Sequence, residues 1–139
     1  MNMKYLMLTV LSVVFLATNA LWSQTDFEDD KVAITTSTNS YEDATNDRFY
    51  EYHAFTVTNK TNAPVKFELI ISYAQDGQEG SSRDGDKKRI ITLDANETIE
   101  GEVGVNDELT LFKAFLPGNS GKKAADSKVK VNNVNVNYL

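Results

Sequence analysis

Apolar side chains at every second position recur along most of the chain, and this spacing constrains the fold more than any other feature. The clearest case is Val65–Tyr73, in which the odd positions are apolar and the even positions, apart from Ile70, are polar. A period of two places one face of a strand in a core and the other in solvent. Because no segment after residue 24 has a convincing helical pattern, we predict an all-β domain.

The same reasoning predicts about seven strands, separated by segments rich in Asn, Asp, Gly and Pro. The strands are expected at Lys31–Thr38, Arg48–Asn59, Val65–Tyr73, Arg89–Leu93, Glu97–Val105, Glu108–Leu116 and Lys128–Tyr138. Because one turn, Asn59–Pro64, separates the second strand from the third, we expect these two to form a hairpin. The remaining segments are predicted to be loops, of which the first is a mobile lead-in: Gln24–Asp30, Asn39–Asp47, Gln75–Lys88 and Pro117–Ser127.

Two of these strands have unusual apolar patterns. In Lys128–Tyr138 the apolar residues stand at odd positions up to Val131 and at even positions from Val134 onward. A β-bulge near Asn132–Asn133 would let both halves face the core. Apolar residues in Glu108–Leu116 occupy both parities, which predicts burial on both faces. One face would carry Leu109, Leu111 and Phe115, and the other Phe112, Ala114 and Leu116.

The number and spacing of these strands resemble the immunoglobulin and fibronectin-type sandwiches as a class. The resemblance covers most of Val32–Tyr138 and rests on strand count and spacing alone. The Cys–Trp–Cys pattern of true immunoglobulin domains is missing, since the chain has no cysteine and its one tryptophan, Trp22, precedes the domain. The predicted fold is therefore an antiparallel β-sandwich of immunoglobulin-like architecture, and a fold of this kind does not define a function.

The first residues, Met1–Ser23, have the features of a secretory signal peptide. A positive charge at Lys4 precedes the apolar stretch Leu6–Ala17, and small residues allow cleavage after Ala20 or Ser23. The apolar stretch is shorter than the roughly 20 residues that a membrane-spanning helix needs. We predict an exported protein, secreted or held in the periplasm or at the cell surface, with one domain over residues 24–139 and no transmembrane segment.

Composition excludes several classes of function. Removal of the signal peptide would leave 13 Lys and Arg against 20 Asp and Glu, a net charge of −7. An acidic domain is repelled by nucleic acid and by anionic membranes, so neither is an expected partner. The absence of cysteine excludes disulfides, thiol catalysis and thiolate metal sites, and in an exported chain it favours a bacterial envelope protein.

No catalytic, cofactor-binding or metal-ligating residue is assigned from the sequence, and no enzyme activity is expected. His53 is the only histidine, and its parity within Arg48–Asn59 points it inward with Glu51. Without a second histidine or a cysteine it lacks the usual metal-binding partners. We therefore expect a hydrogen-bonded or sheet-edge histidine beside Glu51.

A calcium site is an alternative for the acidic, glycine-containing segment Gln75–Lys88. Its carboxylates are Asp76, Glu79, Asp84 and Asp86. Oxygen ligands and flexible backbone suit calcium, but the D-x-[DN]-x-[DN]-G pattern is missing and basic residues lie in the same segment. A flexible solvated loop is the favoured interpretation, and no cofactor is predicted.

Three further patterns in the sequence each allow more than one interpretation. A sugar-stacking or partner-binding surface is one interpretation of five tyrosines, although tyrosine is also common in half-buried strands: Tyr41, Tyr50, Tyr52, Tyr73 and Tyr138. Glycosylation patterns begin at Asn59 and Asn96, where turn chemistry is the favoured explanation. Asparagines 132, 133, 135 and 137 form a polar ladder that would accept another strand if the last strand lies at an edge.

The predicted function is a non-catalytic binding or assembly domain. It would bind an envelope or extracellular protein or glycan through its end loops, or through strand addition along Lys128–Tyr138, with weak self-association through that strand. The first alternative is a calcium-stabilised sandwich that binds a glycan or lipid. The second is a small outer-membrane barrel, which the charges of Lys66 and Glu68 disfavour.

Overall fold

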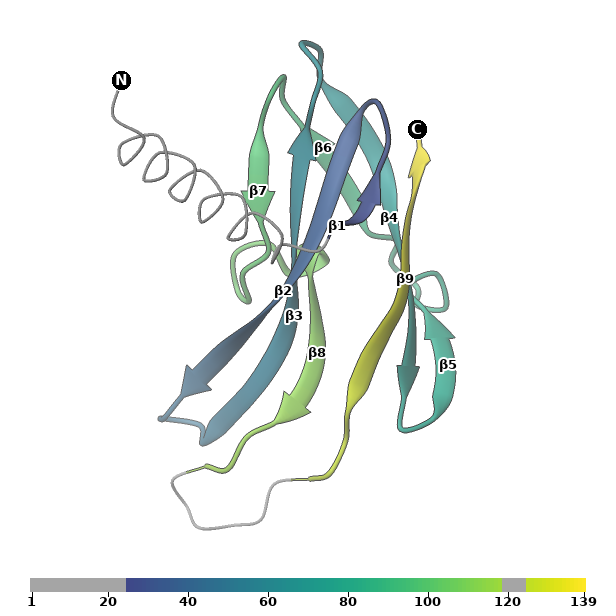
Figure 1. Ribbon diagram of the computed structural model, residues 1–139. Coiled ribbons are helices and arrows are strands. Elements are labelled where there is room, and N and C mark those ends of the chain that lie inside the picture. Colours follow the sequence, from purple (N-terminus) through teal and green to yellow (C-terminus); the bar gives the residue numbers. More distant parts are fainter. Residues whose placement is uncertain (1–24, 119–124) are drawn as a thin grey trace, which may run out of the picture.

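The computed structural model describes residues 25–118 and 125–139, so the predicted signal peptide, Met1–Ser23, lies outside the described residues. Two antiparallel sheets stack on each other (Figure 1), which confirms the predicted all-β sandwich. The described residues contain nine strands instead of the seven expected: β1 Thr25–Glu28, β2 Val32–Asp43, β3 Arg48–Asn59, β4 Val65–Gln75, β5 Gln78–Ser81, β6 Ile90–Leu93, β7 Thr98–Glu100, β8 Thr110–Phe115 and β9 Val129–Tyr138. One short 3₁₀ helix, η1, spans Asp107–Leu109.

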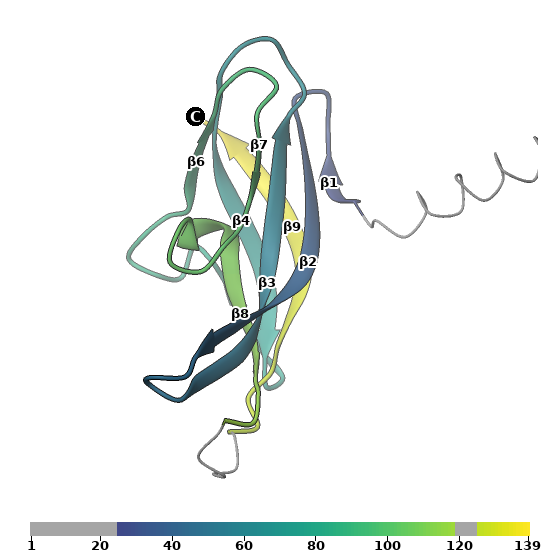
Figure 2. The same cartoon turned by 90° about the vertical axis from the view of Figure 1, so that its left-hand side faces the viewer.

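Each sheet is built around one long strand. In the first sheet β3 pairs with β2 on one side and with β7 and then β8 on the other, and β1 pairs with β2. In the second sheet β4 pairs with β9 on one side and with β6 and β5 on the other. The end of the β2–β3 hairpin extends beyond the rest of the sandwich in both views (Figures 1 and 2).

The predicted hairpin of Arg48–Asn59 with Val65–Tyr73 is wrong, because β3 and β4 lie in different sheets. Both strands carry an apolar face, and stacking one sheet on the other buries both faces at once. Phe55 and Val57 of β3 lie in the same buried cluster as Phe67 and Leu69 of β4. Burial of each such side chain contributes about 1.5–3 kcal/mol, so face-to-face packing decides the topology.

Several predicted loops contain strands. β2 continues to Asp43, paired with β3 without a break, so only the end of Asn39–Asp47 forms a turn. The predicted mobile lead-in contains β1, and Gln75–Lys88 contains β5, which pairs with the end of β4. The β4–β5 turn has positive φ angles at Asp76 (51°) and Gly77 (86°). Asp-Gly is a strong hairpin signal, and it was available in the sequence.

Two predicted strands are shorter in the structure. Glu97–Val105 shrinks to β7, since the chain turns after Glu100 and Asn106 holds the turn, donating from its side-chain amide to the Glu100 carbonyl at 2.8 Å. Glu108–Leu116 begins with η1 before β8 starts at Thr110.

β-Bulges determine which side chains of β9 and β8 face the other sheet. In β9, Ser72 and Tyr73 of β4 pair with Asn133 and Val131, so Asn132 is the extra residue and the predicted bulge is confirmed. A second bulge at Lys113 of β8 was not expected. It places Phe112 and Phe115 on the outer face, opposite Tyr52 and Tyr50, and turns Leu111 and Ala114 toward the other sheet. The predicted faces of this strand are therefore wrong.

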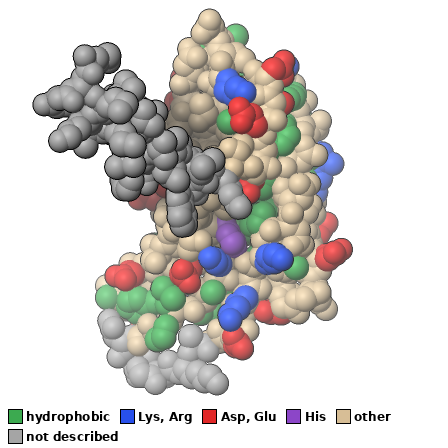
Figure 3. All heavy atoms as spheres, in the orientation of Figure 1, with side chains coloured by type: hydrophobic (Ala, Val, Ile, Leu, Met, Phe, Trp, Pro, Cys, Tyr) green, Lys and Arg blue, Asp and Glu red, His purple; other side chains and the backbone are tan. Residues whose placement is uncertain are grey.

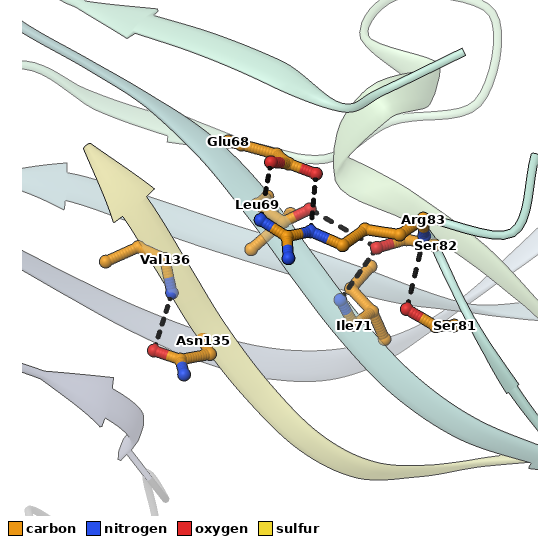
Figure 4. Close-up of polar contacts among 8 residues, drawn as sticks. All are labelled: Glu68, Leu69, Ile71, Ser81, Ser82, Arg83, Asn135 and Val136. Carbon is orange, nitrogen blue, oxygen red and sulfur yellow. Dashed lines mark hydrogen bonds and ion pairs between the residues drawn. The ribbon is translucent and has the colours of Figure 1, made fainter. Parts of the chain in front are cut away.

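The first residues after β5, Ser82 and Arg83, are bound to β4, so this part of Gln75–Lys88 is not a flexible solvated loop. The Ser82 hydroxyl accepts from the Ile71 amide at 2.9 Å and donates to the Leu69 carbonyl at 3.3 Å (Figure 4). Ser82 thus fills the gap between β6 and β5 along β4. Arg83 forms a two-bond ion pair with Glu68, each N···O distance being 3.0 Å, and the Glu68 side chain is 2 % exposed.

The Glu68–Arg83 pair predicts a pH-dependent stability. The bonds from Arg83 hold the pKa of Glu68 below its usual value of 4.5. Stability from this pair is therefore present above about pH 4.5 and is lost as the pH falls through the lower, folded-state pKa. We expect Glu68→Gln to lower the urea midpoint at neutral pH and the difference from wild type to shrink in acid. Urea titrations of both proteins at neutral pH and near pH 3 would measure this difference in midpoint. A difference of equal size at the two pH values would contradict the prediction.

Candidate functional site

The two sheets separate toward the end that holds the β4–β5 turn, and a cleft of about 810 Å³ opens between them. Glu51 and His53 of β3 line it together with Lys113 and Ala114 of β8. Three further segments complete the lining: Ala74 near the end of β4, Asp76 and Gly77 in the β4–β5 turn, and Lys128 with the first residues of β9, Val129–Val131. The cleft therefore draws on four strands, β3, β4, β8 and β9, and on the β4–β5 turn, which are far apart in the sequence.

His53 joins the two sheets beside the cleft. Its Nε2 lies 2.8 Å from the carbonyl oxygen of Val129. A carbonyl oxygen only accepts, so Nε2 carries the proton and donates it. Partial burial lowers the pKa of His53, and the nearby Lys113 ammonium lowers it further. The imidazole is therefore neutral at pH 7, and the expected hydrogen-bonded histidine is confirmed.

Three lysines surround this histidine. Lys113, Lys128 and Lys130 line the cleft, and Figure 3 shows basic side chains gathered around the histidine at the surface. The Lys113 ammonium donates to the Thr38 hydroxyl at 2.8 Å. Three ammonium groups therefore stand beside two carboxylates, Glu51 and Asp76, in a chain that is acidic overall. The cleft favours an anionic group by charge.

Asp76 fixes the wall of the cleft. Its carboxylate accepts from the Lys128 amide and from the Ser127 hydroxyl, both at 2.9 Å. Its own amide donates to the Lys128 carbonyl at 3.1 Å. Asp76 thus binds the β4–β5 turn to the start of β9, and it holds Lys128 in place.

A second, smaller cavity of about 350 Å³ lies on the β2 side of His53. Residues 36–38 of β2 and 131–134 of β9 line it, and Asp26 stands at its border. The hydroxyl of Thr36 is buried and has no hydrogen-bond partner among the described residues. Thr36 therefore lines the cavity and also carries a buried hydroxyl without a partner in the described part of the chain.

An aromatic patch covers the outer face of the first sheet near the end of the β2–β3 hairpin. Ring centroids lie 5.0 Å apart for Tyr41 and Tyr50, 5.8 Å for Tyr50 and Phe112, and 4.7 Å for Phe112 and Phe115. Hydrophobic side chains are visible there in Figure 3. The patch contains only two of the five predicted tyrosines, because Tyr52 is 5 % exposed and Tyr73 and Tyr138 belong to the other sheet. Because the bulge at Lys113 was not expected, the sequence did not predict that Phe112 and Phe115 share this face.

Within residues 25–118 and 125–139, the four carboxylates of the calcium alternative are not grouped as metal ligands. Asp76, Glu79 and Asp84 line one hollow, but no three Asp, Glu or His side chains within residues 25–118 and 125–139 are placed to hold an ion. Asp76 bonds to residues 127 and 128, as described above. Asp84 accepts from the Ser81 amide at 2.8 Å, and Asp86 is exposed.

The glycosylation patterns have different environments. Asn59 is 1 % exposed and Asn96 is exposed in a turn with φ 59°. The Asn59 amide donates to the carbonyls of Ala63 and Asp94 at 2.8 and 2.9 Å, and its oxygen accepts from Thr61. Asn59 therefore joins two turns that cross between the sheets.

Comparison of the chain with protein-family models, curated proteins and solved structures finds no match, so the site rests on its own geometry. In the described part of the chain, no helix is long and apolar enough to cross a membrane.

Proposed function

We propose that this chain is an exported, non-catalytic binding domain of immunoglobulin-like architecture whose ligand carries anionic groups. The observation that carries the proposal is the cleft beside His53, which Lys113, Lys128 and Lys130 border although the chain is acidic. Clustered charge of one sign in a concave site attracts the opposite charge and orients it. The predicted signal peptide supports export.

The neighbouring surface favours an acidic glycan as the ligand. Lys113 lies between Ala114, which lines the cleft, and Phe112, which belongs to the aromatic patch. A chain of sugars that places a carboxylate in the cleft can therefore continue around β8 onto Tyr50 and Phe115. Aromatic rings provide large contact areas for the apolar faces of sugars. An acidic protein segment would use the same lysines without needing the rings.

A non-catalytic role fits the state of the histidine. The Nε2 proton of His53 is held by the Val129 carbonyl, which makes the ring a fixed link between the sheets. Its pKa is lowered by burial, so it stays neutral instead of adding a fourth cation to the cleft. We propose that His53 positions Lys128 and Lys130 by fixing the start of β9, at Val129, against β3.

Titration calorimetry with polygalacturonate oligosaccharides tests the proposal, with neutral cello-oligosaccharides as the comparison ligand. We expect the acidic oligosaccharide alone to bind, and binding to weaken as salt is raised. The variant Lys128→Gln/Lys130→Gln should bind roughly ten-fold more weakly.

A control variant with the same change of charge is Lys66→Gln/Lys87→Gln. Lys66 and Lys87 are exposed and do not line the cleft. We expect this control to bind like the wild type. Equal weakening of binding in both variants would show that net charge, and not the cleft, sets the affinity. Binding of the neutral oligosaccharide with equal affinity would contradict an anionic ligand.

A further inference from the structure

β2 has one side that is only half covered. β1 pairs with it over residues 33–35, and beyond Thr35 no described strand pairs with β2 on that side. On its other side β2 pairs with β3 continuously from Val32 to Asp43. The stretch Thr36–Asp43 is therefore a regular strand with an open edge, and its first three residues line the cavity beside His53.

Hydrogen bonds at the start of β2 show which backbone groups face this edge. The Val32 carbonyl accepts from the Asp29 amide at 3.0 Å, and the Val32 amide donates to the Asp29 carboxylate at 2.8 Å, both on the β1 side. Backbone groups along a strand point to alternate sides. The N–H and C=O groups of Thr36, Thr38, Ser40 and Glu42 therefore point to the open edge.

The other long edge is modified against strand addition, and this one is not. In β9 the Asn135 side chain accepts from the Val136 amide at 2.8 Å, and Asn132 forms a bulge (Figure 4 shows the Asn135 bond). Capped amides, bulges and lysines discourage pairing with another chain. Thr36–Asp43 has no lysine, proline or bulge, and its first charged residue is Glu42. Strand addition along β9, as expected from the sequence, is therefore less favourable than addition along β2.

We propose that a second copy of this chain pairs antiparallel along the open edge of β2, with the two-fold axis at Ser40. In this register Ser40 pairs with Ser40 of the second copy, and Thr38 pairs with Glu42 of the second copy. All of these groups face the edge, so both pairs are of the hydrogen-bonded kind. The two first sheets become one continuous sheet through the same surface on each copy, which closes the assembly as a dimer.

Charge selects this register. The Lys113 ammonium donates to the Thr38 hydroxyl at 2.8 Å, so Glu42 of the second copy arrives beside Lys113. The two-fold axis makes this ion pair twice. A shift of the axis to Asn39 would instead place Glu42 opposite Thr36, which lines a cavity with Asp26. In that register the Glu42 carboxylate would approach the Asp26 carboxylate. Like charges opposite each other are unfavourable, so the Ser40 register is preferred.

Sedimentation velocity over a range of protein concentrations tests the dimer through charge reversal. We expect a monomer–dimer equilibrium for the wild type, and roughly ten-fold weaker association for Glu42→Lys and for Lys113→Glu. The double variant should recover wild-type association, because it restores both ion pairs with opposite polarity. Glu79→Lys, on the other sheet, is the matched control and should associate like the wild type.

Two outcomes of this experiment would overturn the proposal. A wild type that stays monomeric at the highest concentration would exclude the dimer, and a double variant as weak as the single ones would exclude the Ser40 register. The proposal does not rest on the proposed function, since glycan binding is tested at Lys128 and Lys130. Failure of one therefore leaves the other intact.

A second variant and a second measurement address the edge directly. Because the Ser40 amide faces the open edge, Ser40→Pro removes no bond to β3, and we expect a monomer with an unchanged melting temperature. Hydrogen exchange at Thr38, Ser40 and Glu42 should slow as the wild-type concentration rises. Slow exchange at every concentration would mean that residues preceding Thr25 cover the edge, which would overturn the proposal.

Discussion

Gly101→Ala is expected to destabilise the protein by about 3 kcal/mol or more, which is a large part of the stability of a domain of this size. Gly101 is buried, and its amide donates to the Phe55 carbonyl at 3.0 Å. A Cβ atom at this position would overlap the carbonyl group of Leu109. Urea denaturation, monitored by far-UV circular dichroism, would measure the loss of stability.

The backbone around Gly101 has little freedom to move away. Arg89, at the start of the second sheet, donates from Nη1 to the carbonyls of Glu108 and Thr110 at 2.9 and 2.6 Å. These bonds hold η1 and the start of β8 against Gly101. Relief of the overlap would therefore break contacts between the sheets.

Gly85→Ala is the matched control for Gly101→Ala. The nearest atom to a Cβ on Gly85 is the Lys87 amide nitrogen at 4.0 Å, so the substitution meets no obstacle. We expect a stability within about 0.5 kcal/mol of the wild type. Equal stability of both variants would show that the segment around Leu109 adapts, contrary to the prediction.

Asn59→Asp is the second substitution with a large expected effect, on the order of 3 kcal/mol. The side-chain amide of Asn59 donates to the carbonyls of Ala63 and Asp94, and aspartate has no donor for either when ionised. The change also places a carboxylate where the side chain is almost fully buried. We expect a lower urea midpoint at pH 7, with part of the loss recovered in acid, where the carboxyl group gains a proton.

Asn96→Asp provides the control, because Asn96 is exposed in a turn and aspartate also tolerates its positive φ angle. Its stability should stay close to that of the wild type. Similar losses at both positions would mean that added negative charge, and not the buried bonds of Asn59, sets the stability. Urea midpoints of the two variants, measured side by side, separate these explanations.

The sequence contained the signal for the bulge in β9 but not for the one in β8. In β9 the apolar residues change parity, and a bulge is the way to keep all of them in the core. In β8 apolar residues occur at both parities, so the pattern fits several registers equally well. Only the pairing with β3 shows that Lys113 is the extra residue and that Phe112 and Phe115 share the outer face.

The candidate site could not be found in the sequence for a related reason. His53, Lys113 and Lys130 belong to three different strands, Lys128 lies just before the last of them, and no motif joins the four residues. Their meeting depends on which sheet each strand enters and on where the two sheets separate. The composition of the acidic segment Gln75–Lys88 allowed a calcium site, but in the structure its Ser82 and Arg83 bind the segment to β4.

By itself the sequence determined the class of the fold and the position of its long central strands, because the alternation of polar and apolar side chains is a local property of each strand. Residues 48–59 and 65–73 are strands by that criterion alone. Which strands pair was decided by the tertiary structure. β3 and β4 bury their apolar faces against each other across the core, so they stack instead of forming a hairpin. The cleft, its lysines and the open edge of β2 all depend on this arrangement of strands, which contacts between distant parts of the sequence determine.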